Sequence, residues 1–470
     1  MDRKYAFWPI EFAEVLSGEN GEGGFDIVIA NPPYVRQEMI EDPQKPNDKV
    51  AAKQYKEKLL KQIQLDWNDE KGNLIKISQR ADLYVYFYLK GLQLLNPDGV
   101  MCFISSNSWL DVGFGAGLQE ILLKRVPILA IYDNQTKRSF KHADVNTIIA
   151  LFGAPKKRDW LSEIKENKIK FVMFRKPFEE VCFSDILWQI EEAKEERLLN
   201  ENFRLVQKDQ WSLYLEGIEE KEETQQKLTK EMGNYVGNKW GGKYLRAPEI
   251  YWTILEKGKN KMCRLNDLAT IKAGIITGNN EKYYKKRTKD FDADEYSLVF
   301  RSPREVNKIY LNSKDAVSII KIKRVPFEIK RAKLLWVDLR GDKHICHYNA
   351  NCLPFEHNFY GIDSKETGKD KVVCSILNSS LVYFLIEVLG RRGLGGGAIR
   401  LVKIDLLNLP ILKISNDKKI IKVFSKISRR EVRSIFEEFG INPNKPIREQ
   451  EPKPLPDRAE LDKIIFSELG

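Results

Sequence analysis

The sequence is poor in the features that place a protein in a membrane or stabilise it outside the cell. No apolar run approaches the roughly 18 to 20 residues that a spanning helix requires, so we expect no membrane partner. The first stretch, MDRKYAFWPIEF, lacks the long apolar core and small-residue cleavage site of a signal peptide. Six cysteines scattered over 470 residues predict reduced thiols in a cytoplasm rather than a disulfide framework.

Acidic residues are outnumbered by basic ones. The chain has 78 Lys and Arg against 67 Asp and Glu, which gives a formal net charge of +11. Such a balance fits a polyanionic partner, because lysines and arginines that neutralise phosphates release condensed counterions. Charge alone leaves one alternative open, in which the chain is basic because the proteins of its source are generally basic.

The hydrophobic pattern predicts an α/β chain with several domains. FDIVIA (25–30), VMCFIS (100–105) and NTIIALFGA (146–154) are short apolar runs typical of buried strands, and ADLYVYFYLKGLQLL (81–95) predicts a helix packed on them. We therefore expect a partial Rossmann-like domain over residues 1–178.

Three further segments follow in the predicted organisation. Residues 179–235 are charge-dense and glycine-poor, which predicts a helical connector. Residues 236–415 have many Gly and Asn turns between short apolar runs and predict an α+β domain. Residues 416–470 predict a helical tail with a proline-rich linker that breaks off within an amphipathic helix.

The stretch FDIVIANPPYVRQE places a polar turn directly after an apolar strand. Asn31-Pro32-Pro33-Tyr34 lies where open α/β sheets bind their ligands. The prolines fix φ and lack N–H groups, which makes the turn rigid and leaves its carbonyls free as acceptors. With the amide of Asn31 and the ring of Tyr34, the turn suits a planar base that bears an amino group. An ordinary Asn-Pro turn that caps a strand is the alternative.

On these residues the chain resembles DNA adenine amino-methyltransferases, and specifically type IIG restriction-modification enzymes. FWPIEFAEVL (7–16), ADLYVYFYLKGLQLLNPDG (81–99) and RSFKHADVNTIIALF (138–152) are similar to neighbouring stretches of that family. The second half resembles TaqI-like target-recognition domains, in WGGKYLRAPEIY (240–251), IKAGIITGNNEKYY (271–284), ILNSSL (376–381) and GGGAIRLVKIDLLNLPIL (395–412).

The resemblance implies a mechanism. Asn31 and the carbonyl of Pro32 accept hydrogen bonds from the adenine amino group and aim it at the methyl group of S-adenosylmethionine. Tyr34 and Phe140 stack on the two faces of the flipped base. Double-stranded DNA is the implied partner.

A glycine-rich stretch competes for the role of cofactor loop. Gly113, Gly115 and Gly117 are followed sixteen residues later by an acid, Asp133, as in a nucleotide-binding loop. The polar SSNSW separates these glycines from their strand, however, whereas a cofactor loop follows its strand at once. We expect a loop and helix start near the base or DNA pocket, and a permuted cofactor loop is the alternative.

The expected cofactor loop of the family precedes Asn-Pro-Pro-Tyr by about a hundred residues, but only thirty precede it here. The sequence therefore predicts that most of the S-adenosylmethionine site and any nuclease belong to a missing upstream region or a partner subunit. Glu11 and Phe12 weakly match the family segment near the cofactor adenine, and a strand-edge pair is the alternative. We find no carboxylate cluster with Glu-x-Lys that would predict a nuclease.

Three of the four histidines cluster with two cysteines: His344, Cys346, His347, Cys352 and His357. A zinc site is conceivable, but the spacing fits no standard pattern and two strands around an Asn-rich turn would point neighbours to opposite faces. We predict no metal.

Basic residues of the second half are the candidates for DNA contacts, with a solvated basic face as the alternative. They are Lys321, Lys323, Arg324, Lys330, Arg331, Lys333, Arg391, Arg392, Arg400 and Lys403. Phosphate contacts are expected for most of them, because such contacts are the more numerous. Gly395, Gly396 and Gly397 would let the backbone approach a partner closely.

Taken together, the sequence predicts a site-specific DNA adenine methyltransferase module of a restriction-modification system that is incomplete without its cofactor side. The alternative is a DNA-binding specificity protein without catalytic activity.

Overall fold

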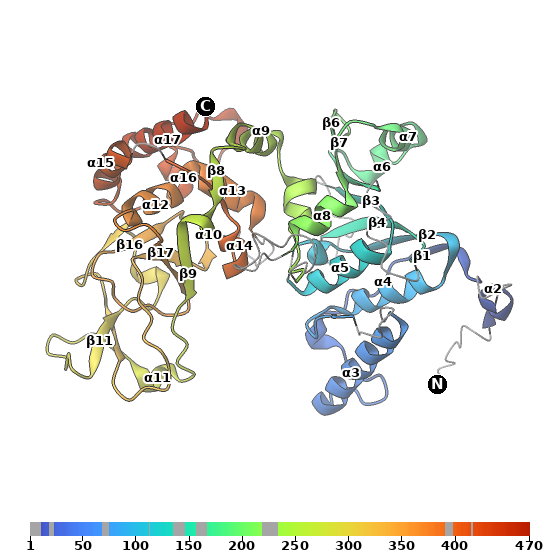
Figure 1. Cartoon of the computed structure of the whole chain (residues 1–470), viewed down its shortest axis with the longest axis horizontal. Coiled ribbons are helices and arrows are strands. Elements are labelled where there is room, and N and C mark those ends of the chain that lie inside the picture. The colour runs from blue at the N-terminus through green and yellow to red at the C-terminus, as the bar shows by residue number, and fades with distance from the viewer. Residues whose placement is uncertain are drawn as a thin grey trace. The chain divides into compact units, whose positions relative to one another are not determined.

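The computed structural model describes residues 11–17, 23–67, 75–111, 113–134, 146–156, 167–218, 234–390, 398–414 and 417–470. It divides into two compact units, Met1–Arg246 and Ala247–Gly470 (Figure 1). Helices and strands alternate in the first unit and are mixed in the second, which confirms the predicted α/β class.

The first unit is built on a seven-stranded sheet in the order β1-β2-β4-β3-β5-β7-β6. Its strands are β1 (Phe25–Ala30), β2 (Leu95–Ser106), β3 (Ile128–Asn134), β4 (Thr147–Gly153), β5 (Lys168–Phe174), β6 (Arg197–Leu199) and β7 (Phe203–Asp209). Its helices and helical turns are α2 (Ala13–Ser17), η2 (Gln37–Met39), α3 (Lys49–Asp66), α4 (Leu83–Gln93), η3 (Asn107–Leu110), η4 (Gly113–Gly115), α5 (Ala116–Arg125), α6 (Phe178–Val181), α7 (Ser184–Glu192), α8 (Gln210–Glu216) and the π-helical turn η5 (Gly241–Arg246).

Aromatic side chains pack on one face of this sheet. The side chains of Met101 and Phe103 on β2 point to this face and are buried. Tyr88 of α4 lies at the centre of its aromatic packing, with ring centroids 5.4 Å from Phe103 and 5.6 Å from Phe152. Its hydroxyl is 2.7 Å from Ser105 Oγ, so a polar group in this core is satisfied.

The opposite face is covered over only part of its width. At the β5 and β7 end, α6 and α7 pack on it with a buried cluster of Val172, Phe174, Val181, Ile186, Ile190, Phe203 and Leu205. At the β1 end, Ile27 and Ile29 are 65% and 74% exposed. Their cross-strand neighbours Val100 and Cys102 are only half-buried. Because strands of parallel sheets are normally buried on both faces, this exposed apolar area is unusual.

The second unit combines several small sheets with helices. A five-stranded sheet has the order β12-β16-β14-β17-β9, a three-stranded sheet β10-β13-β11, and two pairs join β15 with β18 and β19 with β8. The strands are β8 (Met262–Arg264), β9 (Ala269–Ala273), β10 (Tyr284–Lys286), β11 (Tyr296–Val299), β12 (Tyr310–Leu311), β13 (Ser318–Lys321), β14 (Leu334–Val337), β15 (Leu339–Arg340), β16 (Cys346–Asn349), β17 (Phe359–Ser364), β18 (Ile399–Arg400) and β19 (Pro410–Leu412). The helices and turns are α9 (Glu249–Gly258), α10 (Leu265–Leu268), α11 (Asn280–Tyr283), η6 (Pro303–Glu305), α12 (Asp370–Leu377), α13 (Ser380–Leu389), α14 (Lys403–Leu407), α15 (Asp417–Ile427), α16 (Ile435–Glu438), η7 (Ile447–Glu449) and α17 (Pro456–Leu469).

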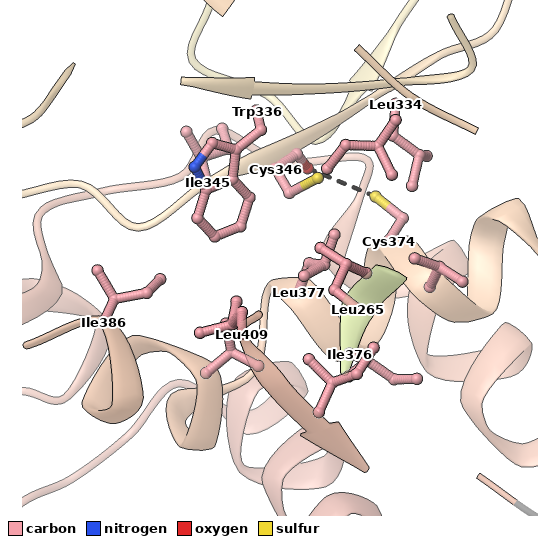
Figure 2. Packing of buried hydrophobic residues seen from close by; sticks show 14 of the residues in the cluster. Leu265, Leu334, Trp336, Ile345, Cys346, Cys374, Ile376, Leu377, Ile386 and Leu409 are labelled. Atoms are coloured by element: carbon pink, nitrogen blue, oxygen red, sulfur yellow. Dashed lines mark hydrogen bonds between the residues drawn. The ribbon is translucent and has the colours of Figure 1, made fainter. Parts of the chain in front are cut away.

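Figure 2 shows how α12 packs on the sheet of this unit. Trp336 and Cys346 come from β14 and β16, and Cys374 and Leu377 come from α12. The thiol of Cys374 donates to the carbonyl of Cys346 at 3.4 Å. All six cysteines are free thiols.

Among the described residues, no single helix is long and apolar enough to cross a membrane. The consecutive helices α12 and α13 reach the required length and apolarity only together, across a bend of 61°, and most of their side chains are buried in the core of the second unit.

The described elements run across the predicted segment boundaries. Residues 197–199 and 203–209 of the expected helical connector form β6 and β7 of the main sheet, because Phe203, Leu205 and Val206 alternate into its buried faces. The expected tail after residue 416 belongs to the second unit, since Leu461 and Ile465 of α17 are fully buried in its core. The unit boundary lies after Arg246, neither at residue 178 nor at residue 235.

A buried charge network attaches α17 to this core and gives a test of its packing. Arg458 is fully buried and donates to Glu438 at 3.0 Å and to the carbonyl of Asn378 at 2.6 Å. Arg458→Met leaves Glu438 buried with Arg430 as its remaining cation, so we expect a loss of about 3 kcal/mol in the free energy of unfolding. Urea denaturation measures it. The exposed Arg429→Met is the control, and equal midpoints for the two variants would contradict the assigned network.

Candidate active site

The carboxyl ends of four strands meet at one edge of the main sheet. β1 is parallel to β2, and β3 is parallel to β5. β4 runs antiparallel to both β2 and β3, so β3 points the same way as β1. Turns that follow β1, β2, β3 and β5 therefore gather at this edge, where open α/β sheets bind ligands.

The turn predicted to hold a base is at this edge, directly after β1. The side chain of Asn31 is exposed and makes no hydrogen bond to any residue that the structure describes. Pro32 is buried, which fixes the position of the turn. The hydroxyl of Tyr34 donates to the carbonyl of Ile104 on β2 at 3.2 Å, and burial raises the pKa of Tyr34 above its usual 10.0. The turn thus presents an available amide acceptor beside an anchored ring.

The ends of the neighbouring strands supply further polar groups. Ser105 and Ser106 end β2, and Asp133 lies near the end of β3. Burial raises the pKa of Asp133 from 3.8 to about 6, and the charge of Arg246 opposes the rise. Asp133 is thus a buried acid near the end of a strand.

Two of the three glycines of LDVGFGAG serve close packing. A Cβ on Gly115 would come within 2.1 Å of the carbonyl of Trp109, and one on Gly117 within 2.1 Å of the carbonyl of Lys76. The two positions therefore need glycine whether or not a ligand binds. As expected, the stretch leads into a helix, α5 (Figure 1).

A second set of contacts at this segment was missed by the sequence reasoning. Asp111 of LDVG pairs with Arg246 and accepts from the backbone N–H of Gly242 at 3.0 Å. Trp240 packs on Trp109 at a centroid distance of 5.7 Å. WGGKYLR therefore packs on the main sheet domain, whereas we had assigned it to the recognition domain. The possible signal was Asp111, the acid directly before the glycines.

Two predicted site residues lie elsewhere or outside the described residues. Phe12 contacts Phe25 at the amino end of β1, with ring centroids 5.4 Å apart, so Glu11 and Phe12 are at the opposite end of this strand from Asn31. A cofactor role for them stays a prediction that this placement disfavours. Phe140 lies outside the described residues.

The histidines of the predicted cluster are held in separate contacts. His344 Nδ1 is 2.7 Å from Arg340, and His347 Nδ1 is 2.7 Å from the carbonyl of Lys308. Burial lowers the pKa of His347 to about 4. In the described part of the chain, no group of three or more His, Cys, Asp or Glu could hold a metal ion. The predicted two strands around a turn are confirmed as β16 and β17.

The predicted DNA-contact residues fall on two segments of the second unit. Lys321 to Lys333 lie at the end of β13 and in the loop to β14, and Arg400 and Lys403 lie on β18 and α14. Two of them are already paired within the unit: Lys321 with Glu295 at 2.9 Å, and Arg400 with Asp338 at 2.8 Å. Arg391, Arg392 and residues 395–397 lie outside the described residues. A role in DNA binding stays a prediction for the whole set.

Part of the first unit is similar in sequence to restriction-modification methylases. Residues 1–140 match the family model of the Eco57I restriction-modification methylase. The Type II methyltransferase M.PaeR7I of Pseudomonas aeruginosa is 29% identical over 124 residues, which are 26% of this chain and 18% of that protein. M.BstVI of Geobacillus stearothermophilus is 29% identical over 118 residues, which are 25% of this chain and 17% of that protein. The chain is thus similar to less than a fifth of the length of these relatives.

Solved structures of restriction-modification enzymes also share similarity with the chain. The type IIG restriction endonuclease BpuSI has a TM-score of 0.40 at 12% identity, over 94% of this chain and 54% of that one. The Type IIL enzyme MmeI, in complex with DNA, has a TM-score of 0.44 at 12% identity over the same shares.

The packing role of the glycines can be tested with a matched pair of substitutions. Gly117→Ala forces a Cβ against the carbonyl of Lys76, so we expect it to cost about 1–3 kcal/mol in the free energy of unfolding. Gly113→Ala meets no atom within 4 Å and should change stability by less than about 0.5 kcal/mol. Chemical denaturation followed by circular dichroism compares them. Equal effects of the two substitutions would refute the packing account.

Proposed function

We propose that this chain carries the base-holding side of a DNA adenine methyltransferase from a type II restriction-modification system. The observation that carries the proposal is the turn after β1, where Asn31 offers an unengaged acceptor beside the anchored ring of Tyr34. The similarity of residues 1–140 to the Eco57I methylase family supports it.

The proposed role of the turn follows from the chemistry of an aromatic amine. Such an amine is a poor nucleophile, because its lone pair is delocalised into the ring. Hydrogen bonds from the amino group to Asn31 and to the carbonyl of Pro32 would favour the localised form. This interaction is stronger in the transition state than in the ground state, as catalysis requires. Tyr34 would stack on the flipped base and offset part of its unstacking cost.

The methyl donor of this enzyme class is S-adenosylmethionine, and the glycine stretch that resembles a cofactor loop packs against its own domain. Gly115 and Gly117 are occupied by contacts with the backbone of their own domain. In the part of the chain that the structure describes, β1 pairs with β2 alone and is the edge strand. We propose that the cofactor side is supplied by a further polypeptide segment, either upstream in a longer protein or in a partner subunit.

The exposed apolar area of the main sheet supports this proposal. Ile27, Ile29, Val100, Cys102, Ile149 and Leu151 share one face, and none of them is buried. A segment that adds a strand beside β1 and places helices on this face would bury them. Burial of these six apolar side chains would drive association with such a segment, because removing apolar surface from water is favourable.

Substitution of Asn31 tests the role of the turn. Asn31→Ala removes the proposed acceptor, and we expect methyl transfer to fall about 100-fold or more, as for the loss of one transition-state hydrogen bond. Because Asn31 is exposed, the stability of the chain should not change. The measurement is transfer of labelled methyl groups to DNA. The product of the adjoining reading frame is added to supply the proposed cofactor side. An unchanged rate would refute the assignment.

Two substitutions of Tyr34 separate its ring from its hydroxyl. Tyr34→Ala removes the stacking surface, which contributes about 1–3 kcal/mol per base, so we expect a loss of about tenfold or more in the same assay. Tyr34→Phe keeps the ring and loses the hydrogen bond to Ile104, worth about 1 kcal/mol, and should change the rate by less than about fivefold. An equal loss in both variants would argue against stacking.

Calorimetry with S-adenosylmethionine tests whether the cofactor side is missing. The purified chain should give no heat of binding at micromolar cofactor. Binding should appear once the further polypeptide segment proposed to supply the cofactor side, called the complementing segment, is added. Micromolar binding by the chain alone would contradict the proposal, while methyl transfer in neither preparation would favour the alternative, a DNA-binding specificity protein without catalytic activity.

A further inference from the structure

A basic cavity lies beside the candidate active site in the first unit. Its volume is about 440 Å³, and its walls are formed by α3, by residues 37–40 and by residues 79–86. It is lined by the cations Lys49, Lys53, Lys56 and Arg80 and by the carboxylates Glu38 and Glu57. Four positive and two negative charges give a local net charge of +2.

The cavity shares its wall with the loop that begins at the candidate active site. The loop continues from Tyr34, and the N–H of Leu83 donates to the carbonyl of Val35 at 3.0 Å. The N–H of Gln37 donates to the Asp82 carboxylate at 3.0 Å. Lys56 donates to the backbone and side-chain carbonyls of Gln37 at 3.1 and 2.9 Å. The position of the cavity is therefore fixed relative to the turn after β1.

The helix that carries the lysines is attached at both ends. At its start, the Asp48 side chain accepts from the backbone N–H groups of Val50 and Ala51. At its end, the indole N–H of Trp67 donates to the carbonyl of Leu89 on α4 at 3.2 Å. Lys49, Lys53 and Lys56 follow a spacing that places them on one side of a helix. They form a row about 10 Å long, from the helical rise of about 1.5 Å per residue.

Most of this positive charge has no ion-pair partner among the residues that the structure describes. Lys49, Lys53 and Arg80 are exposed, and no carboxylate of the described residues lies within ion-pair distance of them. Lys56 differs from these three residues, because its ammonium group donates a hydrogen bond to the side chain of Gln37. The cavity can therefore neutralise an external anion without breaking an internal ion pair.

We propose that this cavity binds backbone phosphates of the DNA strand next to the base held by the turn after β1. The inference rests on the proposed function and adds a DNA contact in the first unit to those predicted in the second. A single small anion would contact only one end of the row of lysines. A DNA strand carries one charge per about 3.4 Å of helix axis, so it presents several phosphates along the same length.

Salt-dependent DNA binding tests the proposal with a charge-matched control. The double variant Lys49→Gln, Lys53→Gln removes two cavity lysines. The control Lys58→Gln, Lys61→Gln removes two exposed lysines of the same helix that do not line the cavity. Affinity for a labelled duplex is measured by fluorescence anisotropy over a salt series. Loss of two phosphate contacts should reduce the slope of log affinity against log salt by about 1.8. The control should keep the slope of the unmodified chain.

An unchanged slope in the cavity variant, or an equal reduction in the control, overturns the inference. Asn31→Ala separates it from the proposed function, since this variant should lose methyl transfer and keep the full slope. If no preparation transfers methyl groups but the slope still falls only in the cavity variant, the phosphate site stands and the proposed function fails. No measurable DNA binding at low salt overturns both.

Discussion

Strands that pair in parallel are normally buried on both faces of their sheet, and the first unit of the chain meets this requirement over only part of its sheet. On one face, α4 and its neighbours cover the sheet around Tyr88. On the other, α6 and α7 cover the end near β5 and stop short of β1. Ile27 and Ile29 therefore lie exposed on an edge strand. The same edge strand ends in the turn proposed to hold the base, so the reactive groups and the uncovered surface belong to one element.

Contacts with the rest of the first unit hold the turn after β1 in a fixed position. Pro32 is buried, Tyr34 is bonded to β2, and the following loop is attached to α4 through Val35 and Gln37. These contacts leave the amide of Asn31 exposed. A backbone turn that is already fixed loses little entropy when its ligand arrives. The basic cavity is built from the same loop, which would place phosphate binding and base holding in one rigid frame.

Local pattern was enough to predict the main elements of the site. The ranges 25–30 and 81–95 correspond closely to β1 and α4, because a short apolar run and a long amphipathic one have different lengths and periods. The strands β6 and β7 were missed, since charged residues flank their apolar positions and mimic a solvated helix. The contact of Asp111 with Arg246 joins residues 135 positions apart, and no local pattern records such a pairing. The lysines of α3 were also missed, because their role depends on which wall of a cavity they line.

The most direct test of the open edge is amide hydrogen exchange in residues 25–30. In the purified chain, the N–H groups of β1 that point away from β2 should exchange rapidly, while those of β2 are protected. Addition of the complementing segment should slow the exchange of these β1 groups. Full protection of β1 in the chain alone, unchanged by any addition, would contradict the claim that the sheet is completed from outside.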